Sequence, residues 1–484
     1  SGGNPFGSSG SNPSSGGGFG SSGGSGGGAS GGGSSGGTCS GGNLCNQIHS
    51  CSNGSTTVSG TIYDPAGKNP LYDVVAYIPN QTPKPITPGA SCYSCSDLYT
   101  GNPIATALTG PDGKFTIQNA PDGANIPLVI QIGKWRKQLT IPNVAQCQNT
   151  AIPDKTLTLP KNQSEGDIPS IGIATGSADS MECLLLRIGV DASEYGGGAG
   201  GAGRIHIFQG VNTGNMSAGA TTAPAAPVAS DAMWDSQPDL MKYDIAILSC
   251  EGNDTTEMNQ QALFDYAANG GRVFASHFHY AWFNSGPFST YNLARWTTGA
   301  QPMTRNNGAI IGGVVETTLS NGGGAFPKGQ ALAQWLANVN ALGVPARPGG
   351  QPAAPAGELP IEEPKHNADV SAANTPSTAW IVADQQARPA GATQYFSFDT
   401  PLDKPANMQC GRVVYSDLHV GSASNDYGGA AGGTGVVNGI VPSQCGMGDL
   451  SPQEKALEFM LFDLSACITP NSQPPMAPAP GPVQ

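Results

Sequence analysis

Residues 270–280 read Gly270-Gly271-Arg272-Val273-Phe274-Ala275-Ser276-His277-Phe278-His279-Tyr280, an apolar run that ends in two histidines separated by one residue. A predicted helix at 256–269 precedes this run, and the apolar segment Tyr243–Cys250 precedes that helix. Elsewhere in the second half of the chain and before it, we expect strands at 168–176, 204–208, 380–383, 394–398 and 411–416, and helices at 180–188, 330–342 and 451–465. Alternation of strands and helices predicts an α/β, doubly wound parallel sheet over 167–468.

The segment 56–160 has a different pattern, with short stretches of alternating apolar and polar residues between turn residues. It predicts strands at 57–63, 73–78, 113–117, 126–132 and 137–141, which together indicate a small antiparallel β-sandwich. An insertion that contains Cys92-x-x-Cys95 separates the second strand from the third. We expect disulfides to hold this insertion, and Cys147 and the trio Cys39, Cys45 and Cys51 offer partners.

The ends of the chain have compositions that do not favour a packed core. Of the first 42 residues 33 are Gly or Ser, which predicts either a flexible tether or an arm ordered by neighbouring subunits in an assembly. A cysteine-rich connector is expected at 43–55 and a proline-rich tail at 469–484. The chain is therefore expected to be multidomain.

Charge and cysteine usage restrict the class of protein. The net charge of −13 argues against nucleic-acid binding, because phosphates require a basic surface. Eleven cysteines with few lysines and arginines are typical of an extracellular or cell-surface protein. We expect disulfides at ten of them, with the pairing open, and a free thiol at Cys250; the ten are Cys39, Cys45, Cys51, Cys92, Cys95, Cys147, Cys183, Cys410, Cys445 and Cys467.

No stretch of 18 or more apolar residues occurs, so no transmembrane segment is expected. A beginning rich in Gly and Ser also follows the acylated cysteine of many bacterial lipoproteins. A lipid anchor just upstream of Ser1 is therefore one expectation for how the chain is held at the outer cell surface.

Candidate functional residues follow the predicted strands of the α/β part, because ligands of parallel α/β sheets bind beyond the carboxyl ends of the strands. If the segment around His277 and His279 is extended, both imidazoles project to the same face. The residues that follow the strands are Thr175, Gly176, Gln209, Cys250, Glu251, His277, His279, Asp417 and His419.

The sandwich segment resembles a known family. Residues 58–67, 70–71, 109–115 and 120–123 look like a carboxypeptidase regulatory-like domain with a transthyretin-like fold. This resemblance implies a non-catalytic β-sandwich of a secreted or surface protein. The insertion around Cys92 departs from the family pattern.

The α/β part resembles the class I glutamine amidotransferase-like superfamily, in particular its ThuA-like branch, through residues 243–252, 263–280 and 411–419. The resemblance implies an amidotransferase- or flavodoxin-like sheet with a nucleophilic cysteine at a strand-to-helix elbow. Ser276 and His277 stand at that elbow here. Glutamine hydrolysis is therefore not expected, and a role without catalysis is favoured.

Three interpretations of the histidines remain open. His277, His279 and His419, with Glu251 or Asp417, would make a zinc or iron site. Alternatively, His277 and His279 are buried, hydrogen-bonded side chains among aromatic residues. A Ser276–His–Asp triad is the third interpretation, but Asp417 and His419 project alike from one strand, so neither can orient the other.

These observations favour an exported, disulfide-stabilised structural or binding protein. In its sharper form it is the subunit of an extracellular filament, in which the N-terminal tail adds to an exposed sandwich edge of the next subunit. Its expected partners are copies of itself, other surface proteins or a glycan. The alternative is a secreted metal-dependent hydrolase of a carbohydrate or amide, with His277, His279 and His419 as ligands and Glu251 as base.

Overall fold

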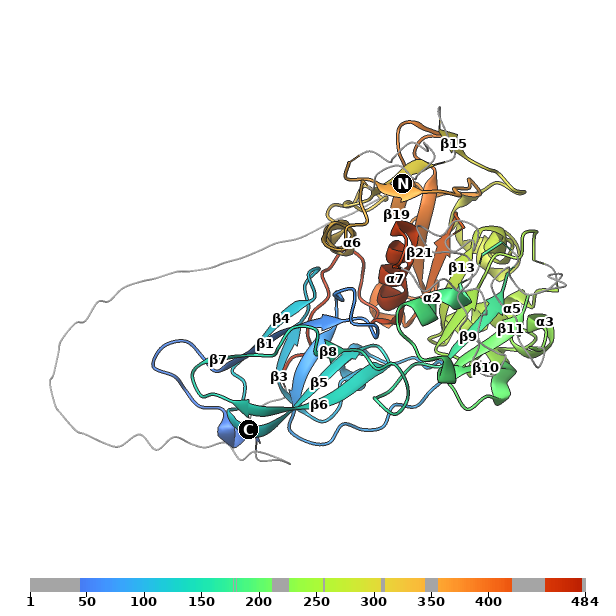
Figure 1. The fold of residues 1–484 in the computed structure, drawn as a ribbon. Coiled ribbons are helices and arrows are strands. Elements are labelled where there is room, and N and C mark those ends of the chain that lie inside the picture. Colours follow the sequence, from blue (N-terminus) through green and yellow to red (C-terminus); the bar gives the residue numbers. More distant parts are fainter. Residues whose placement is uncertain are drawn as a thin grey trace, which may run out of the picture. The chain divides into compact units, whose positions relative to one another are not determined.

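The larger sheet of the protein has ten strands in the order β10-β11-β9-β12-β13-β22-β21-β19-β16-β17 (Figure 1). The structure is a computed structural model, and it describes residues 44–176, 178–179, 181–210, 226–255, 257–305, 310–343, 356–419 and 449–480. The strands are β9 Ile171–Thr175, β10 Tyr195–Gly197, β11 Ile205–Gln209, β12 Ile245–Leu248, β13 Arg272–Ser276, β16 Ile311–Val315, β17 Leu359–Ile361, β19 Ser377–Ala383, β21 Thr393–Thr400 and β22 Gly411–Ser416.

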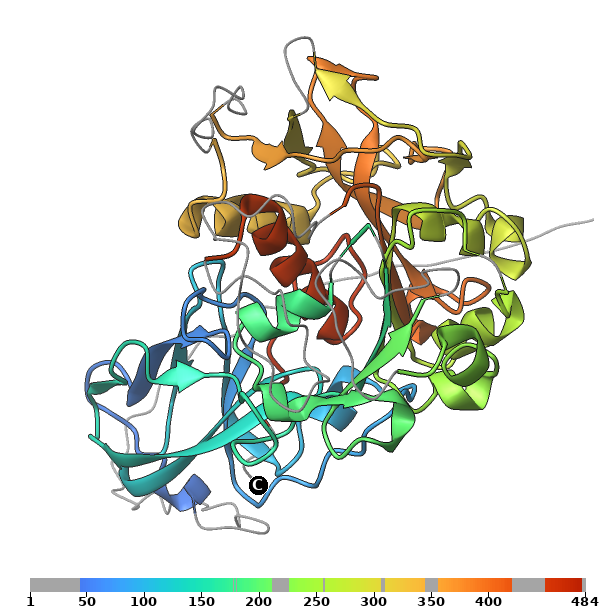
Figure 2. The ribbon, with the colours of Figure 1, turned by 45° about the vertical axis from the view of Figure 1, so that its right-hand side comes forward.

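The first six strands of that order pair in parallel, and β21, β19, β16 and β17 join antiparallel (Figure 2). Five of the parallel strands, β11-β9-β12-β13-β22, follow the 2-1-3-4-5 order of a doubly wound sheet. The prediction of a parallel sheet is therefore confirmed for the first six strands of the order and wrong for β21, β19, β16 and β17. The connections from β19 to β21 and from β21 to β22 are about ten residues or fewer, too short for the crossover that a parallel pair requires.

Helices accompany the sheet where the sequence predicts them; α2, α5 and α7 are shorter than predicted, and α6 begins and ends earlier. They are α2 Glu182–Arg187, α5 Gln260–Ala268, α6 Pro327–Asn338 and α7 Pro452–Ser465, with short turns at α1 Cys95–Leu98, α3 Ala229–Ala232 and α4 Gln237–Leu240. Helix α7 begins with a capping box in which Ser451 and Glu454 bond to each other's backbone N–H groups. All of its residues are buried, so it is a core helix and not an amphipathic surface helix.

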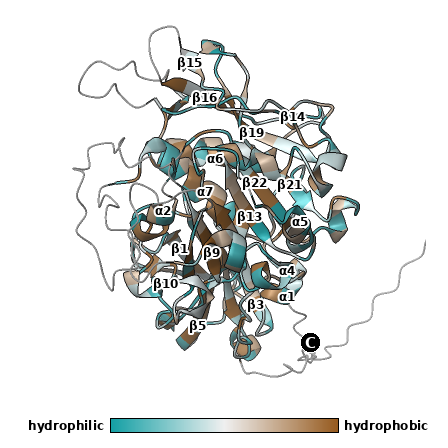
Figure 3. Ribbon diagram, turned by 90° about the vertical axis from the view of Figure 1, so that its right-hand side faces the viewer, coloured by the Kyte–Doolittle hydropathy of each residue, from teal (hydrophilic) through white to brown (hydrophobic). Residues whose placement is uncertain are grey.

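The central strands are buried on both faces. Every residue of β9, β12, β13 and β22 is buried, and β9 and β13 are coloured as predominantly hydrophobic in Figure 3. Two-sided burial is the property of parallel sheets covered by helices, and it explains the continuous apolar runs of the sequence.

The segment 56–160 forms two four-stranded sheets. One has the order β4-β1-β7, with β8 also paired to β1, and the other is β3-β2-β5-β6. The strands are β1 Thr57–Tyr63, β2 Val75–Pro79, β3 Pro103–Leu108, β4 Lys114–Gln118, β5 Gly123–Ile132, β6 Trp135–Val144, β7 Asn149–Ala151 and β8 Leu157–Thr158. The prediction of a wholly antiparallel sandwich is wrong in one respect, because β1 pairs in parallel with β7 and β8.

The two parts share a hydrophobic core. One cluster of buried side chains contains Val58 and Ile130 from the sandwich, Ile173 from β9 and Phe462 from α7. The described residues accordingly belong to one compact unit, although the sequence pattern changes near residue 160. The end of the chain also contacts the sandwich, where Thr106 donates a hydrogen bond of 2.8 Å to the carbonyl of Pro478.

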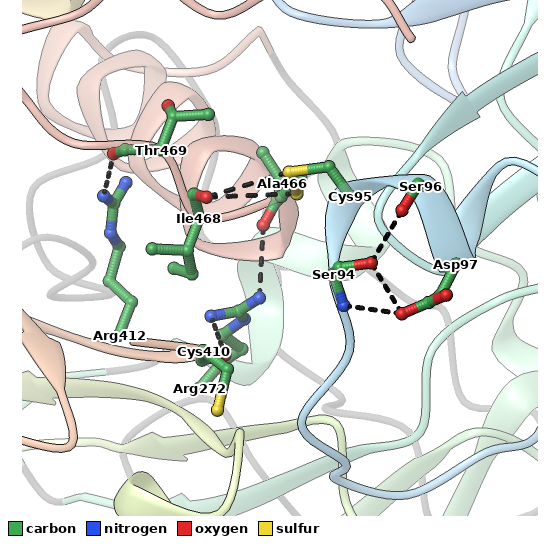
Figure 4. The surroundings of a disulfide bond; sticks show 11 residues. Ser94, Cys95, Ser96, Asp97, Arg272, Cys410, Arg412, Ala466, Ile468 and Thr469 are labelled. Atoms are coloured by element: carbon green, nitrogen blue, oxygen red, sulfur yellow. Dashed lines mark hydrogen bonds between the residues drawn. A yellow bond between two sulfur atoms is a disulfide. The ribbon is translucent and has the colours of Figure 1, made fainter. Parts of the chain in front are cut away.

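Disulfides join segments that are far apart in the chain. Cys92 bonds to Cys410 and Cys95 bonds to Cys467, so both cysteines of the sandwich insertion are linked to the α/β part. Figure 4 shows the surroundings, where Arg272 donates to the carbonyls of Cys410 at 2.8 Å and Ala466 at 3.3 Å. Cys147, considered above as a partner for the insertion, bonds instead to Cys51.

The remaining cysteines are less fully described. Cys45 and Cys183 are also disulfide-bonded, and Cys250 is a free, buried thiol. Cys39 and Cys445 lie outside the described residues, as does the tail at 1–42. In the part of the chain that the structure describes, no helix is both long and apolar enough to cross a membrane.

Candidate functional site

Three of the candidate residues meet beyond the ends of neighbouring parallel strands. Cys250 lies two residues after β12, His277 follows β13 directly, and His419 lies three residues after β22. Gly176 follows β9 at the same edge. A Cβ at Gly176 would lie 2.0 Å from the carbonyl oxygen of Cys250, so only glycine permits this close approach.

His277 stands at a sharp turn. Strand β13 ends at Ser276, and His277–Trp282 form a 3-10 helix. The φ of His277 is +40°, a left-handed conformation that is uncommon for a residue with a side chain. Two contacts hold the turn: the Tyr415 hydroxyl donates to the carbonyl of His277 at 2.7 Å, and the backbone N–H of Cys250 donates to Ser276 Oγ at 2.9 Å.

The side chains of Cys250, His277 and His419 converge. Cys250 Sγ lies 3.4 Å from His277 Nδ1, and His419 Nε2 lies 3.0 Å from the same nitrogen. All three atoms lie within 4.8 Å of one another. The three residues are 0%, 1% and 8% exposed, so the cluster is shielded from bulk water.

The outer nitrogens of both histidines contact acceptors. His419 Nδ1 lies 2.8 Å from a carboxylate oxygen of Glu363, and His277 Nε2 lies 3.3 Å from the carbonyl oxygen of Ala300. Glu363 is held beside His419 by a short antiparallel contact, in which the N–H of His419 donates to the carbonyl of Glu363 at 3.2 Å. Each imidazole therefore keeps only its inward nitrogen for the cluster.

The two histidines differ in proton affinity. Burial, followed by the neighbouring His419 and Lys365, lowers the pKa of His277 to about 2. Burial alone would lower the pKa of His419 as well, but its hydrogen bonds to Cys250 and Glu363 raise that pKa to about 9. Of the two imidazoles, His419 therefore binds a proton more readily than His277.

His279 does not join the cluster. Its Nδ1 lies 3.0 Å from Trp282 Nε1 and 2.9 Å from Thr255 Oγ1, and its Nε2 lies 2.9 Å from the carbonyl of Ser249. Burial lowers the pKa of His279 to about 4. The set of His277, His279 and His419 considered from the sequence is thus not the set that the structure assembles. The two-residue alternation of a strand stops at Ser276, and in a 3-10 helix residues i and i+2 point to different sides.

The other candidates are near the cluster but directed elsewhere. Asp417 is buried and accepts from the backbone N–H groups of Asn367 at 2.5 Å and Ala368 at 2.8 Å. Burial raises the pKa of Asp417 to about 7. Ser276 Oγ accepts from the backbone N–H of Cys250, and Asp417 accepts from backbone N–H groups and the Tyr415 hydroxyl. Among the described residues, no Ser276–His–Asp triad is therefore assembled. Glu251 is 5% exposed and lies near the backbone of Gly210.

Sequence reasoning did not find the roles of Cys250 and Glu363. Cys250 was singled out at a strand end but assigned only as a free thiol, and Glu363 lies in a segment rich in proline and alanine. The signal for Cys250 was available: its position matches those of His277 and His419 at the ends of adjacent strands. Glu363 had no such signal, because its proximity to His419 depends on the pairing of residues 363–364 with 418–419.

Comparison with known proteins gives weak likenesses. No protein-family model and no curated protein matches the sequence. A ThuA-like protein from Parabacteroides merdae is 12% identical, with 62% of this chain and 91% of that chain covered at a TM-score of 0.30. A type II cohesin–X-dockerin complex from Acetivibrio cellulolyticus is 15% identical, with 28% and 85% covered at a TM-score of 0.17. At these TM-scores neither likeness supports a conclusion about function.

Proposed function

We propose that this chain is an exported, disulfide-stabilised binding protein that assembles with copies of itself by strand addition at the edge of its β-sandwich. Bridges such as Cys51–Cys147 and Cys92–Cys410 support export, because disulfides persist outside the reducing cytosol. The observation that carries the proposal is an open stretch of backbone on β6, the last strand of its sheet.

The direction of that backbone follows from one pair of hydrogen bonds. Arg136 and Asp167 exchange both backbone bonds, at 3.0 and 2.8 Å, on the side of β6 that faces away from β5. The backbone N–H and C=O of one residue point to the same side of a strand, and those of the next residue point to the opposite side. The register of β6 against β5 has no bulge that would interrupt this alternation. The N–H and C=O groups of Gln138 and Thr140 therefore point outward too, and among the described residues they meet no backbone partner.

A hollow lies beside this edge. Its volume is about 570 Å³, and its lining includes Leu44, the turn at 79–83 and residues 127–129 and 138–140. None of the lining residues is charged. An extended, uncharged chain with small side chains is suited to such a hollow, because its backbone would bond to β6 without burying a charge.

The N-terminal arm of a second copy has this chemistry. Residues 1–42 contain no charged residue, and 33 of them are Gly or Ser. An arm that pairs with the β6 edge of the next subunit makes a head-to-tail contact, and such contacts extend into filaments unless the rotation closes a ring. A fold-back of the arm onto its own subunit is the competing arrangement.

The test compares the mass of the full chain in solution with the masses of three variants. Deletion of residues 1–42 and the substitution Thr140→Pro, which removes one outward N–H without removing a bond to β5, are both expected to give monomers. Thr140→Ala keeps the N–H group and should assemble like the parent chain. A peptide of residues 1–42 should bind the deleted protein and not its Thr140→Pro form. A monomeric parent chain, or oligomers unaltered by the deletion, would refute the proposal.

A second candidate is a metal-dependent hydrolase, favoured by the convergence of Cys250, His277 and His419. The metal site of this hydrolase would keep His277 and His419, two of the three histidines expected from the sequence, and would have Cys250 in place of His279. The burial of the cluster restricts its substrates to small amides or sugars. Hydrolysis of small chromogenic amides and glycosides that chelator abolishes would support it, and equal rates with and without chelator would exclude it.

A further inference from the structure

We propose that Cys250, His277 and His419 together bind a zinc ion, with Glu363 holding His419 from behind. The site lies at the ends of β12, β13 and β22 and is independent of assembly at the β6 edge. It combines one sulfur and two nitrogens, all directed at the same small volume.

The hydrogen-bonding of the imidazoles is the first argument. Glu363 and Ala300 offer acceptors to the outer nitrogens of His419 and His277, so in neutral rings those nitrogens carry the hydrogens. The inward nitrogens lie 3.0 Å apart, where a single proton between them makes a hydrogen bond. A cation can take the place of that proton, because both inward nitrogens then offer it a lone pair.

The distances are the second argument. Zn–N bonds of about 2.0–2.1 Å and a Zn–S bond of about 2.3 Å at tetrahedral angles place two nitrogens about 3.3 Å apart and a sulfur about 3.6 Å from a nitrogen. The corresponding separations here are 3.0 Å between the nitrogens and 3.4 Å between Cys250 Sγ and His277 Nδ1. These two separations are within a few tenths of an ångström of the zinc values, and the third, between Cys250 Sγ and His419 Nε2, is at most 4.8 Å.

The identity of the ligands selects the metal. A thiolate with two imidazoles suits zinc, whereas magnesium and calcium require oxygen ligands and non-haem iron sites use a carboxylate beside two histidines. The Glu363–His419 pair matches the carboxylate–histidine–zinc arrangement, in which the outer carboxylate fixes the ring and increases its basicity. The other charges that act on the two histidines are Asp179 and Lys365.

Three protein ligands leave one coordination position for water or a small anion. When zinc binds, the inward nitrogen of His419 and the Cys250 thiol both release their protons to solvent, so that a neutral imidazole and a thiolate bind the ion. Because Cys250, His277 and His419 are buried, molecules larger than water or a small anion cannot easily reach the ion. This burial distinguishes the site from an open hydrolase cleft.

The test uses the full chain, freed of metal with chelator and titrated with Zn²⁺ and with Co²⁺. We expect one ion per chain, release of protons on binding, and a thiolate-to-cobalt charge-transfer band in the near ultraviolet. Cys250→Ser should abolish that band, and His419→Gln should reduce the bound metal to well below one ion per chain. Glu363→Gln should weaken binding by about 10–100-fold.

His279→Gln is the matched control, because His279 is equally buried but bonds outside the cluster; it should bind metal as the parent chain does. Near-ultraviolet circular dichroism of each metal-free variant separates loss of a ligand from loss of the fold. Failure of the folded parent chain to bind either ion would overturn the proposal. So would a charge-transfer band that persists in folded Cys250→Ser, or binding that depends on His279 and not on His419.

Discussion

The carboxyl groups of Asp64, in the sandwich, and Glu458, in helix α7, act on each other, and one buried oxygen of each, Asp64 Oδ2 and Glu458 Oε1, accepts no hydrogen bond from the described residues. A proton held between the two groups would satisfy both oxygens, and we infer that the pair shares one. Glu458 is fully buried and also accepts a hydrogen bond of 2.7 Å from the side-chain amide of Asn69. Burial raises the pKa of both groups, and for Glu458 the negative charge of Asp64 raises it further. The contact between the two parts of the molecule therefore contains a titratable pair.

The pair predicts a stability that depends on pH. A pKa that is higher in the folded than in the unfolded chain means that folding takes up protons, so its contribution is complete in acid and is lost as the pH rises through the raised values. We expect the free energy of unfolding to fall as the pH rises above the ordinary range of a carboxyl group and through the raised pKa values of the pair. Denaturant melts of Glu458→Gln, which keeps a hydrogen-bond donor for Asp64 at any pH, should show a smaller fall. Equal slopes for variant and parent would contradict a shared proton.

A second buried group, Asp463 of α7, joins two cations and should be important for folding. It lies 2.7 Å from Lys328 Nζ and 2.6 Å from Arg412, and both cations are 0% exposed. Asp463→Asn leaves Lys328 without its carboxylate and should cost about 3–5 kcal/mol, because an uncompensated charge stays buried. Asp403→Asn removes the exposed ion pair with Lys404 and should change stability by less than about 1 kcal/mol in the same urea melts. Similar losses for the two variants would show that the network is solvated.

The two bridges of the insertion should not act additively. Cys92–Cys410 and Cys95–Cys467 close nearly the same large loop, with sequence separations of 318 and 372 residues. Removal of one bridge leaves the other to restrict the unfolded chain, so either double-serine variant alone should lose less than the roughly 2–5 kcal/mol typical of a lost disulfide. Removal of both should cost more than the sum of the single losses. Strict additivity in thermal melts would indicate that each bridge stabilises through local contacts.

Gly113 lies in the turn that precedes β4, where its N–H donates to the carbonyl of Gly110 at 2.9 Å. Its φ is +71°, and a Cβ there would lie 2.6 Å from Pro70 Cβ and 2.9 Å from the carbonyl oxygen of Ile62. Gly113→Ala should therefore destabilise by more than the roughly 1–2 kcal/mol that left-handed backbone alone costs. Gly391→Ala is the control, because Gly391 has a φ of +73° with no atom within 4 Å of the added Cβ. Equal melting temperatures for the two variants would show that the close contacts of a Cβ at Gly113 add no cost to that of its left-handed backbone.

Much of the α/β part was predictable because its strands are buried on both faces. Continuous apolar runs such as Tyr243–Cys250 and Gly270–Ser276 lie within a residue or two of β12 and β13, and the closing helix at 451–465 matches α7. The short strands β7, β8 and β17 were not predicted. Each is three residues or fewer, so none is long enough to show an alternation of apolar and polar residues. Each forms only because a longer strand lies beside it.

The sequence by itself determined the alternation of strands and helices, five of the eight sandwich strands, and the places at strand ends where Cys250, His277 and His419 stand. These are local properties, set by hydrophobic period and turn residues. Only the tertiary structure decided the antiparallel half of the sheet, the bridges from Cys92 and Cys95, and the exclusion of His279 from the cluster. Such features depend on which segments meet in space and on the direction of the backbone after β13, and neither leaves a periodic trace in the chain.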